Sequence, residues 1–444
     1  MKKFLILSIL VAGLSFRAIA QQKENTAPAA EKKTPPVSLT FSGYINTDIF
    51  FDSRQTVMAR EGQWLFFPEN IRKDADGKDL NAKGSYNILN IQTRIRTNIT
   101  GPDILGAKST GLLEGEFYGS ANASINSLRI RHAWVKLSWP KTELLVGQAW
   151  HPFYVPEAGP EVVSLNAGAP FLVFCRNPQV RVTQRLGNFY LAAAVLSQLD
   201  HTSTGPDGPS PKYLRNSVIP ELVGQVRYAA TVGKTEIIAG ASIDFLMMTP
   251  RLTSDVVVRP AYDTVINSKV VHHDAVVASY KATEHSSALS YNVFAKVKFP
   301  RLSVKAGGVY TGNGYGFSMM GGYAGKSITD TARGLIDYAT IRTLSIYGDV
   351  NAVEKHWSVG LFGAFCRNLG AGTEVIGPYY SRGANIDYLY RVAPRLVMTL
   401  NKLKVGLEVD YTVAAYGTII GNGMVSNSKE VANIRALLGV FYYF

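Results

Sequence analysis

The chain has 444 residues, including 40 Gly, 23 Tyr and 20 Phe, and its 46 Lys and Arg exceed its 33 Asp and Glu to give a net charge of +13. Beyond residue 16 no stretch approaches the roughly 20 apolar residues of a transmembrane helix, which excludes a helical membrane protein. Two Cys are too few for a disulfide-stapled scaffold. The abundance of Gly and aromatic residues suits strands and turns instead.

The amino-terminus has the pattern of a secretory signal peptide. Lys2 and Lys3 precede an apolar run over 4–16, and Ala18-Ile19-Ala20 has the small–x–small form of a cleavage site. We expect a signal peptide over 1–20, cleaved after Ala20, and then a flexible periplasmic lead-in over 21–37, rich in Pro, Ala and Lys. A retained anchor is the alternative, although the apolar run is too short to span a bilayer as a helix.

From residue 38 onward, apolar and polar residues alternate in about sixteen runs, each long enough for the ~9–11 residues of a tilted membrane strand. The predicted strands cover 38–51, 86–100, 107–118, 127–139, 142–150, 178–186, 189–198, 220–230, 234–247, 286–299, 301–312, 338–350, 355–366, 384–400, 402–415 and 431–444. No composition break divides them, so residues 38–444 are predicted to form one domain.

The connections between these strands alternate in length. The short ones include 139–142, 186–188, 231–233, 299–301 and Asn401, and the long polar ones are 52–85, 151–177, 199–219, 248–285, 313–337, 367–383 and 416–430. Outer-membrane β-barrels have tight periplasmic turns and long outer loops. The sequence therefore predicts an all-β transmembrane antiparallel barrel with both chain ends on the periplasmic side. A soluble β-sandwich is the alternative, but it has no reason to sort its loops by length.

Single strands support an inward charged face. In 402–415, 286–299 and 86–100, apolar residues alternate with Lys404, Glu408, Asp410, Lys296, Lys298, Arg94 and Arg96. Turning such a strand over would place an Arg or Lys in lipid, which costs about 2–4 kcal/mol near the midplane. The run 127–139 fits less well, because Ala133, Val135 and Leu137 share parity with Arg129 and Arg131. We expect either a β-bulge there or a loop that covers its inner side.

The last strand ends on an aromatic carboxy-terminus. Its alternate positions carry Ile434, Ala436, Leu438, Val440, Tyr442 and Phe444. A period of two places all six on one face, which suits a strand that meets lipid. This ending resembles that of Gram-negative outer-membrane barrels, and the resemblance implies that Phe444 is read by the barrel-assembly machinery.

A barrel of this width encloses water, because side chains alone cannot fill it. The basic residues that parity places on its inner wall are Arg94, Arg96, Arg129, Arg131, Arg181, Arg185, Arg227, Lys296, Lys298, Lys305, Arg391, Arg395 and Arg435. Fewer acidic residues share that face: Asp48, Glu114, Glu116, Glu221, Asp244, Glu408 and Asp410. Surplus guanidinium groups would concentrate anions in the lumen. Alternatively, wall Arg pair with wall Glu and merely brace the barrel. Charge spread strand by strand over an exported chain argues against nucleic-acid binding.

The connection 151–177 is unusually apolar for a loop, and we expect it to bury its Val, Leu, Phe and Pro inside the barrel. Here the chain resembles the trimeric porins, whose third outer loop folds inward. Val155-Pro156-Glu157-Ala158-Gly159 is similar to the Pro-Glu-Phe-Gly of that loop, with Ala158 in place of Phe. Segments 128–135, 146–150, 176–181 and 390–395 are similar to the DcaP-like and phosphate-selective porin branch.

The porin resemblance implies a homotrimer, passive diffusion, and a constriction in which loop carboxylates face wall arginines. Carried over, Glu157 and Glu161 are the loop acids, and Arg94, Arg129, Arg131 and Arg181 are the facing bases. The Ala158 departure affects the expected shape of the constriction. Lipids, lipopolysaccharide and small anionic solutes are the expected partners in the outer membrane.

Other candidate sites are weak. The segment 74–79 resembles part of a calcium loop but lacks the bidentate Glu, so a polar turn is preferred. His272-His273 has no third ligand at a recognisable spacing and reads as a solvated loop. Cys175 and Cys366 could pair, although two separate buried thiols are the default. No catalytic motif occurs, and no cofactor or metal is expected.

The sequence thus predicts a non-enzymatic outer-membrane porin for small hydrophilic solutes, with a preference for anions such as carboxylates or phosphate-like solutes. The first alternative is a structural or adhesive barrel with a closed lumen. A lipase-type barrel enzyme is less favoured, because the 7 His include no convincing partner for a nucleophilic Ser.

Overall fold

The computed structural model describes residues 37–119 and 122–444. The predicted signal peptide over 1–20 and the lead-in over 21–37, apart from Val37, lie outside the described residues. No helix in the described ranges is long and apolar enough to cross a membrane.

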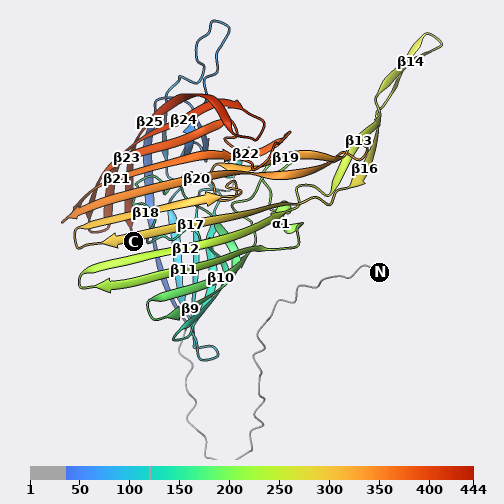
Figure 1. Ribbon diagram of the computed structural model, residues 1–444. Helices are drawn as coiled ribbons and strands as arrows, with labels where there is room; N and C mark the ends of the chain where they lie inside the picture. The colour runs from blue at the N-terminus through green and yellow to red at the C-terminus, as the bar shows by residue number, and fades with distance from the viewer. Residues whose placement is uncertain (1–36, 120–121) are drawn as a thin grey trace, which may run out of the picture. The chain divides into compact units, whose positions relative to one another are not determined.

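The described chain forms a closed antiparallel barrel of 16 strands (Figure 1). Each strand pairs with its neighbour in the sequence, and the last strand pairs with the first to close the ring. The barrel strands are β1 (Ser38–Asp52), β5 (Arg94–Thr100), β6 (Lys108–Glu116), β7 (Arg129–Ser138), β8 (Thr142–Trp150), β9 (Arg176–Leu186), β10 (Phe189–Leu196), β11 (Glu221–Val232), β12 (Thr235–Met248), β17 (Ser286–Lys298), β18 (Leu302–Thr311), β20 (Leu335–Glu354), β21 (Trp357–Gly370), β23 (Ile386–Leu400), β24 (Leu403–Ile419) and β25 (Val425–Tyr443). The predicted barrel is confirmed, and so are its predicted strands apart from the single strand over 86–100.

The long connections carry further short elements that the sequence did not predict. They are β2 (Thr56–Ala59), β3 (Trp64–Pro68), β4 (Ser85–Leu89), η1 (Asn122–Ser124), α1 (Lys212–Arg215), β13 (Thr253–Arg259), β14 (Tyr262–Ile266), β15 (Lys269–His273), β16 (Val276–Lys281), β19 (Gly321–Asp330) and β22 (Tyr379–Arg382). Pairing of β13 with β16 and of β14 with β15 makes a long arm that extends away from the barrel (Figure 1).

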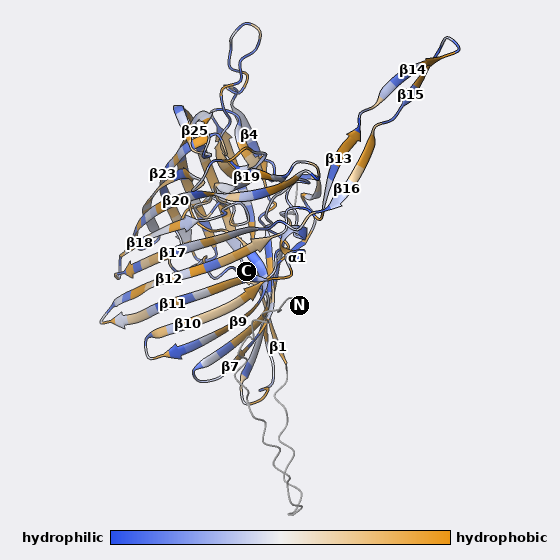
Figure 2. Ribbon diagram, turned by 45° about the vertical axis from the view of Figure 1, so that its right-hand side comes forward, coloured by the Kyte–Doolittle hydropathy of each residue, from blue (hydrophilic) through white to orange (hydrophobic). Residues whose placement is uncertain are grey.

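Hydrophobic and hydrophilic residues alternate along the barrel strands (Figure 2), and their exposure places the apolar ones outside and the polar ones inside. In β17, Leu289, Tyr291 and Val293 are 45%, 46% and 55% exposed, whereas Ser290 and Asn292 between them are 1% and 3% exposed. The same holds in β24, where Leu407, Val409 and Tyr411 face outward and Glu408 and Asp410 are buried. This outward apolar band is what a lipid-facing wall requires.

Two strands depart from simple alternation. The prediction of one strand over 86–100 is wrong, because a turn over 90–93 separates β4 from β5 and reverses the outward parity between them. Tyr86 and Ile88 are exposed before the turn and Ile95 after it, while Ile91 is buried. The bulge expected in 127–139 is confirmed, since the pairing of β7 with β6 skips Arg131. That extra residue keeps both Arg129 and Arg131 inside and still turns Val135 outward.

Aromatic residues mark the rim formed by the short turns. Phe189, Phe299, Trp357 and Tyr442 are all exposed and lie at strand ends beside short connections. The described chain begins and ends at this same rim, since β1 starts opposite Thr100 and the Tyr443 amide donates to the carbonyl of Lys402. Such a girdle is typical of barrels at a membrane–water interface.

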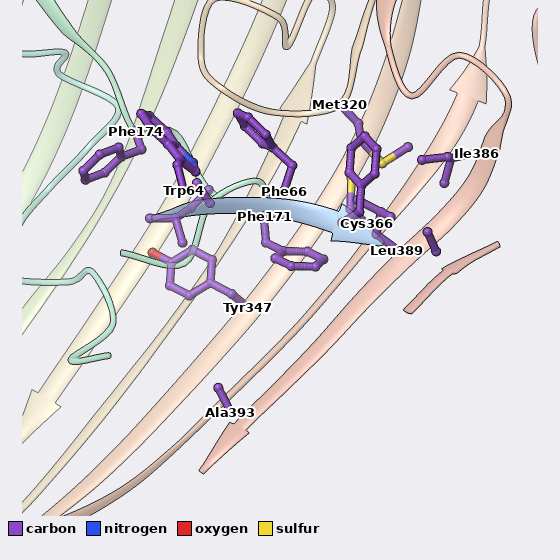
Figure 3. Packing of buried hydrophobic residues seen from close by; sticks show 14 of the residues in the cluster. Trp64, Phe66, Phe171, Phe174, Met320, Tyr347, Cys366, Ile386, Leu389 and Ala393 are labelled. Atoms are coloured by element: carbon purple, nitrogen blue, oxygen red, sulfur yellow. The ribbon is translucent and has the colours of Figure 1, made fainter. Parts of the chain in front are cut away.

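Two loops fold into the barrel and meet in one apolar cluster. The infolded loop, residues 151–175, contributes Phe171 and Phe174, and the hairpin β2–β3 contributes Trp64 and Phe66 (Figure 3). Inward residues of β20, β21, β23 and β24 complete the cluster. The inward course of the third loop is confirmed, whereas the burial of the first loop was not predicted. Cys366 lies in this cluster, and both cysteines are free and buried.

Candidate pore and its infolded loop

Carboxylates and cations of the opposite wall hold the infolded loop across the lumen. The Val163 and Ser164 amides donate to the two oxygens of Glu408 at 2.6 and 3.0 Å. The Glu161 amide donates to Asp349 at 3.1 Å. Hydrogen bonds to charged groups are stronger than neutral ones, so β20 and β24 fix the loop firmly.

Basic wall side chains bind the loop's carbonyl groups. Arg391 donates to the carbonyl of Ala169 at 3.0 Å and to that of Phe66, in the hairpin β2–β3, at 3.2 Å. The wall also makes room for the loop, because a side chain at Gly406 would meet Val163 at 2.7 Å. These contacts explain why an apolar loop lies inside a polar barrel: the wall satisfies its backbone while its side chains pack together.

A cavity of about 710 Å³ lies between the infolded loop and the wall formed by β5 to β11. Its basic lining residues are Arg94, Arg96, Arg131, Lys136, Lys141, Arg181, Arg185 and Arg227, and its acidic ones are Glu114, Glu143 and Glu157. It extends to Trp139, Pro140 and Lys141 at a short turn, so it reaches the short-turn rim. Eight basic groups against three acidic ones make this a strongly positive chamber.

The two predicted loop acids both contact basic wall residues. Glu157 forms an ion pair with Arg227 at 3.2 Å and is about half exposed. Glu161 forms one with Lys305 at 2.9 Å. Burial would raise the pKa of Glu161, but the bound Lys305 ammonium outweighs that effect and lowers it. The bases that form ion pairs with these acids are Arg227 and Lys305. Of the bases that the resemblance implied, Arg94, Arg131 and Arg181 line the same cavity as Glu157.

Three of those implied bases bind wall and loop acids instead. Glu116, fully buried, accepts from Arg94, Arg129 and Arg131 at 3.2, 2.6 and 2.7 Å. Arg129 also reaches Asp200, which lies in the connection after β10. We call this set, with Glu114 and Arg176, the arginine network. It is the bracing arrangement that the sequence left open as an alternative for wall arginines.

Three further predicted wall residues are buried and paired. Arg395 binds Asp349 through two bonds of 2.6 and 3.0 Å, and Arg435 binds Asp52 through two bonds of 2.9 and 2.6 Å. Arg391 binds loop carbonyls, as described above. None of these three lines the cavity, because the folded-in loops cover their part of the wall.

Arg96, Arg181 and Arg227 line the cavity, as does Arg185. Within residues 37–119 and 122–444, no ion pair is formed by Arg96, Arg181 or Arg185. Arg227 and Arg185 lie over the ring of Tyr190 at 4.8 and 5.8 Å. Arg96, Arg181 and Arg185 are therefore the part of the predicted basic wall that lines the cavity without an ion pair to the described residues.

Some functional groups of this region were not singled out from the sequence. Trp134, Trp150 and Tyr154 line the cavity, and burial raises the pKa of the Tyr154 phenol to about 12, so it stays neutral. Aromatic residues of strands and loops are too common for a sequence signal to distinguish these three. Only the loop's fold brings Tyr154 against Trp150.

The pair of Asp200 and His201, next to the arginine network, was not predicted from the sequence either. Burial lowers the pKa of His201 to about 4, against the opposing effect of Asp200. Burial would raise the pKa of Asp200, but His201, Arg176 and Arg129 outweigh it and hold that pKa below its ordinary value. Their connection 199–219 was expected as a polar outer loop, and nothing in its composition indicates that Asp200 turns back to the wall.

The weaker candidates remain ordinary surface features. Asp74 accepts from the amides of Asp76 and Lys78, as a polar turn does. His272 is exposed and contacts Asp263 at 2.5 Å. One group in the described ranges, His151, Glu221 and Asp244, has ligand-type atoms within 4.8 Å of one another. None of its members lines the cavity.

No family model and no curated protein matches the chain. Among solved structures, it is similar to the outer membrane channel DcaP of Acinetobacter baumannii, with a TM-score of 0.63, 16% identity, and coverage of 92% of this chain and 97% of that one. It is similar to OmpT, an outer membrane protein of Vibrio cholerae, with a TM-score of 0.51 and 10% identity, and this match covers 93% of this chain and 100% of that one. It is also similar to an anion-selective porin from Comamonas acidovorans, with a TM-score of 0.50 and 13% identity, and this match covers 92% of this chain and 100% of that one.

At these identities the likeness concerns the fold, and it extends over nine-tenths of this chain. The closed barrel, the apolar outer band and the infolded third loop were expected from the sequence and are present in this structure. This chain has the fold of the outer-membrane porins.

Proposed function

We propose that this protein is an outer-membrane porin through which small hydrophilic solutes diffuse passively, with a preference for anions. The observation that carries the proposal is the cavity beside the infolded loop, where basic side chains outnumber acidic ones. Arg96, Arg181 and Arg185 there form no ion pair with any residue that the structure describes. Fixed positive charge along a low-dielectric wall raises the local concentration of anions and repels cations. Carboxylates and phosphate-like groups suit guanidinium forks.

The proposal also includes the export, the membrane location and the assembly of the protein. Residues 1–20 act as an export signal cleaved after Ala20, residues 21–37 form a lead-in, and residues 38–444 form the barrel. Phe444 directs insertion, and the assembled protein is a homotrimer surrounded by outer-membrane lipid and lipopolysaccharide. The apolar band and the aromatic rim support the membrane location.

A planar-bilayer recording across a salt gradient tests this function. We expect conductance to enter in steps of three, with a reversal potential that indicates anion preference. Arg181→Gln together with Arg185→Gln should reduce the anion-to-cation permeability ratio about two- to fivefold, since two unpaired charges leave the cavity wall.

The matched control is Arg301→Gln. Arg301 is an Arg at a short turn whose side chain is 77% exposed and paired with Glu354, and it does not line the cavity. Its variant should leave the reversal potential unchanged. A cation-selective wild-type pore would refute the anion preference while leaving the barrel intact.

One observation favours a second candidate, a structural or adhesive barrel with a closed lumen. The cluster of Trp64, Phe66, Phe171 and Phe174 fills the lumen against β20 to β24. If this packing fills the whole cross-section of the barrel, the cavity is closed at one end and conducts no solute. Absence of any conductance from correctly folded, heat-modifiable protein would support this candidate over the porin.

A further inference from the structure

The most unusual polar group inside the barrel lies outside the cavity. The buried triad consists of His151, Glu221 and Asp244, whose residues are 0%, 1% and 1% exposed. His151 opens the infolded loop, Glu221 begins β11, and Asp244 lies on the neighbouring strand β12. The chain thus brings three ligand-type side chains together from one loop and two strands.

Among the described residues, the two carboxyl groups of the triad have no Lys or Arg partner and only His151 as a nearby base. Both oxygens of Asp244, one oxygen of Glu221 and Nε2 of His151 have no hydrogen-bond partner among the described residues. No Lys or Arg in the same ranges forms an ion pair with Glu221 or Asp244. Buried carboxylates need a compensating positive charge, because an isolated charge in an apolar site is very unfavourable.

Other buried acids of the lumen meet this requirement in visible ways. Asp52 binds Arg435, Asp349 binds Arg395, and Glu116 binds three arginines. Asp410 has no hydrogen-bond partner either, but the charges of Arg391 and Arg435 act on it. The triad lacks such a partner, and its His151 ring packs against Phe153 and Phe317 at 5.4 and 5.1 Å.

The spacing of the triad suits a shared ion. Nε2 of His151 lies 3.3 Å from Glu221 and 4.0 Å from Asp244. Two ligands about 2.1 Å from a common ion in tetrahedral geometry are separated by about 3.4 Å. One imidazole with two carboxylates favours Zn²⁺ or a similar transition metal. Ca²⁺ would need six to eight oxygens, more than this site provides.

We propose that His151, Glu221 and Asp244 bind one divalent transition-metal ion, such as Zn²⁺, which ties the start of the infolded loop to β11 and β12. The ion supplies the positive charge that the two carboxylates lack, and it takes up their unpaired oxygens. The Phe153 amide donates to Nδ1 of His151 at 3.1 Å. Ligation through Nε2 requires the proton on Nδ1, so this hydrogen bond must break when the ion binds.

Because the site is buried, the ion enters while the barrel folds, and the test is therefore made on refolding full-length mature protein. The protein is refolded in detergent with ZnSO₄ or with a chelator, freed of unbound metal by gel filtration, and analysed by atomic emission. We expect about one Zn²⁺ per chain, and a higher thermal midpoint for the zinc-refolded sample. Neither measurement depends on conductance, so a failed porin hypothesis leaves this test valid.

Asp244→Asn and Glu221→Gln keep the size of each side chain and should reduce bound zinc to less than a tenth of an equivalent. Their midpoints should be the same with zinc and with chelator. His272→Ala is the matched control, because exposed His272 lies beside Asp263 and Asp274 and could bind zinc weakly at the surface. It should retain the full equivalent.

Two results would overturn the proposal. The first is zinc that is lost in His272→Ala and retained in Asp244→Asn and Glu221→Gln. The second is wild-type protein that binds neither Zn²⁺ nor Mn²⁺ and has the same midpoint with metal and with chelator, which would mean that the two carboxyl groups share a proton instead.

Discussion

Arginines of the inner wall fall into two groups, which their burial separates. Arg395 and Arg435 are nearly inaccessible and form two-bond pairs with Asp349 and Asp52. Arg181 and Arg185 lie along the cavity without an ionic partner among the described residues. The first group stabilises the barrel, and we assign the second to the passage of anions. Parity alone cannot distinguish them, because both groups face inward.

Arg435→Met should lower the free energy of unfolding by about 3–5 kcal/mol, since Asp52 would be left buried without its cation. Arg435→Met combined with Asp52→Asn should recover most of that loss, because no uncompensated charge remains. Denaturant titration of detergent-folded protein measures both. A double variant as unstable as the single one would show that shape, and not charge pairing, makes Arg435 important.

The His201–Asp200 pair makes the protein sensitive to acid. The folded pKa of His201, about 4, lies below its unfolded value of about 6.5, so the unfolded chain binds the proton first. The stability that neutral His201 contributes is therefore complete above pH 6.5 and is lost as the pH falls toward 4, by about 3 kcal/mol. Asp200, whose pKa is lowered, adds a further loss only below about pH 4.

His201→Asn, which keeps an acceptor or donor near Ser318, should flatten this acid response. Unfolding free energies measured between pH 7 and pH 4.5 would check it. Equal slopes for the wild-type protein and the variant would contradict the assignment of the response to His201.

At the scale of elements, the infolded loop depends on a few charged contacts with the wall. Glu408→Gln replaces one of the two carboxyl oxygens that accept from the Val163 and Ser164 amides with an amide nitrogen, which cannot accept. We expect the free energy of unfolding to fall by about 1–3 kcal/mol and current fluctuations to increase as the loop loosens. Glu354→Gln, at an exposed position beside a short turn, is the control. If the current through Glu408→Gln fluctuates no more than that through the wild-type protein, packing alone holds the loop in place.

Much of this element-level structure could be predicted from the sequence. Alternation located all barrel strands because lipid on one side and polar side chains on the other impose a strict period of two. Alternation failed at 90–93, where a turn between β4 and β5 changes which residues face outward. The arm over β13–β16 was missed because its strands belong to no buried face and read as a polar loop.

The candidate site was predictable only in outline. Glu157, Arg181 and Arg227 could be chosen from parity and from the likeness to porin loops. The actual partners, Glu157 with Arg227 and Glu161 with Lys305, depend on how the loop crosses the lumen. The triad left no trace in the sequence, since His151 is 70 positions from Glu221 and no spacing rule joins them.

At the scale of the whole molecule, apolar and charged side chains occupy different regions of the barrel. Apolar side chains face outward around the barrel, while the interior is split between an apolar cluster of folded-in loops and a basic cavity. The cluster packs against the wall of β20 to β24. In the proposed function, the basic cavity is the path that anions follow.

The most direct test uses single cysteines on β9 in a background of Cys175→Ser and Cys366→Ser. Thr183 lines the cavity, whereas its neighbour Val182 is exposed on the outer face. In lipid vesicles, Thr183→Cys should react with a charged, water-soluble thiosulfonate, and with an anionic reagent several times faster than with a cationic one of equal size. Val182→Cys should not react. Equal or faster reaction with the cationic reagent, or ready labelling of Val182→Cys, would contradict a basic, water-filled passage inside a lipid-facing wall.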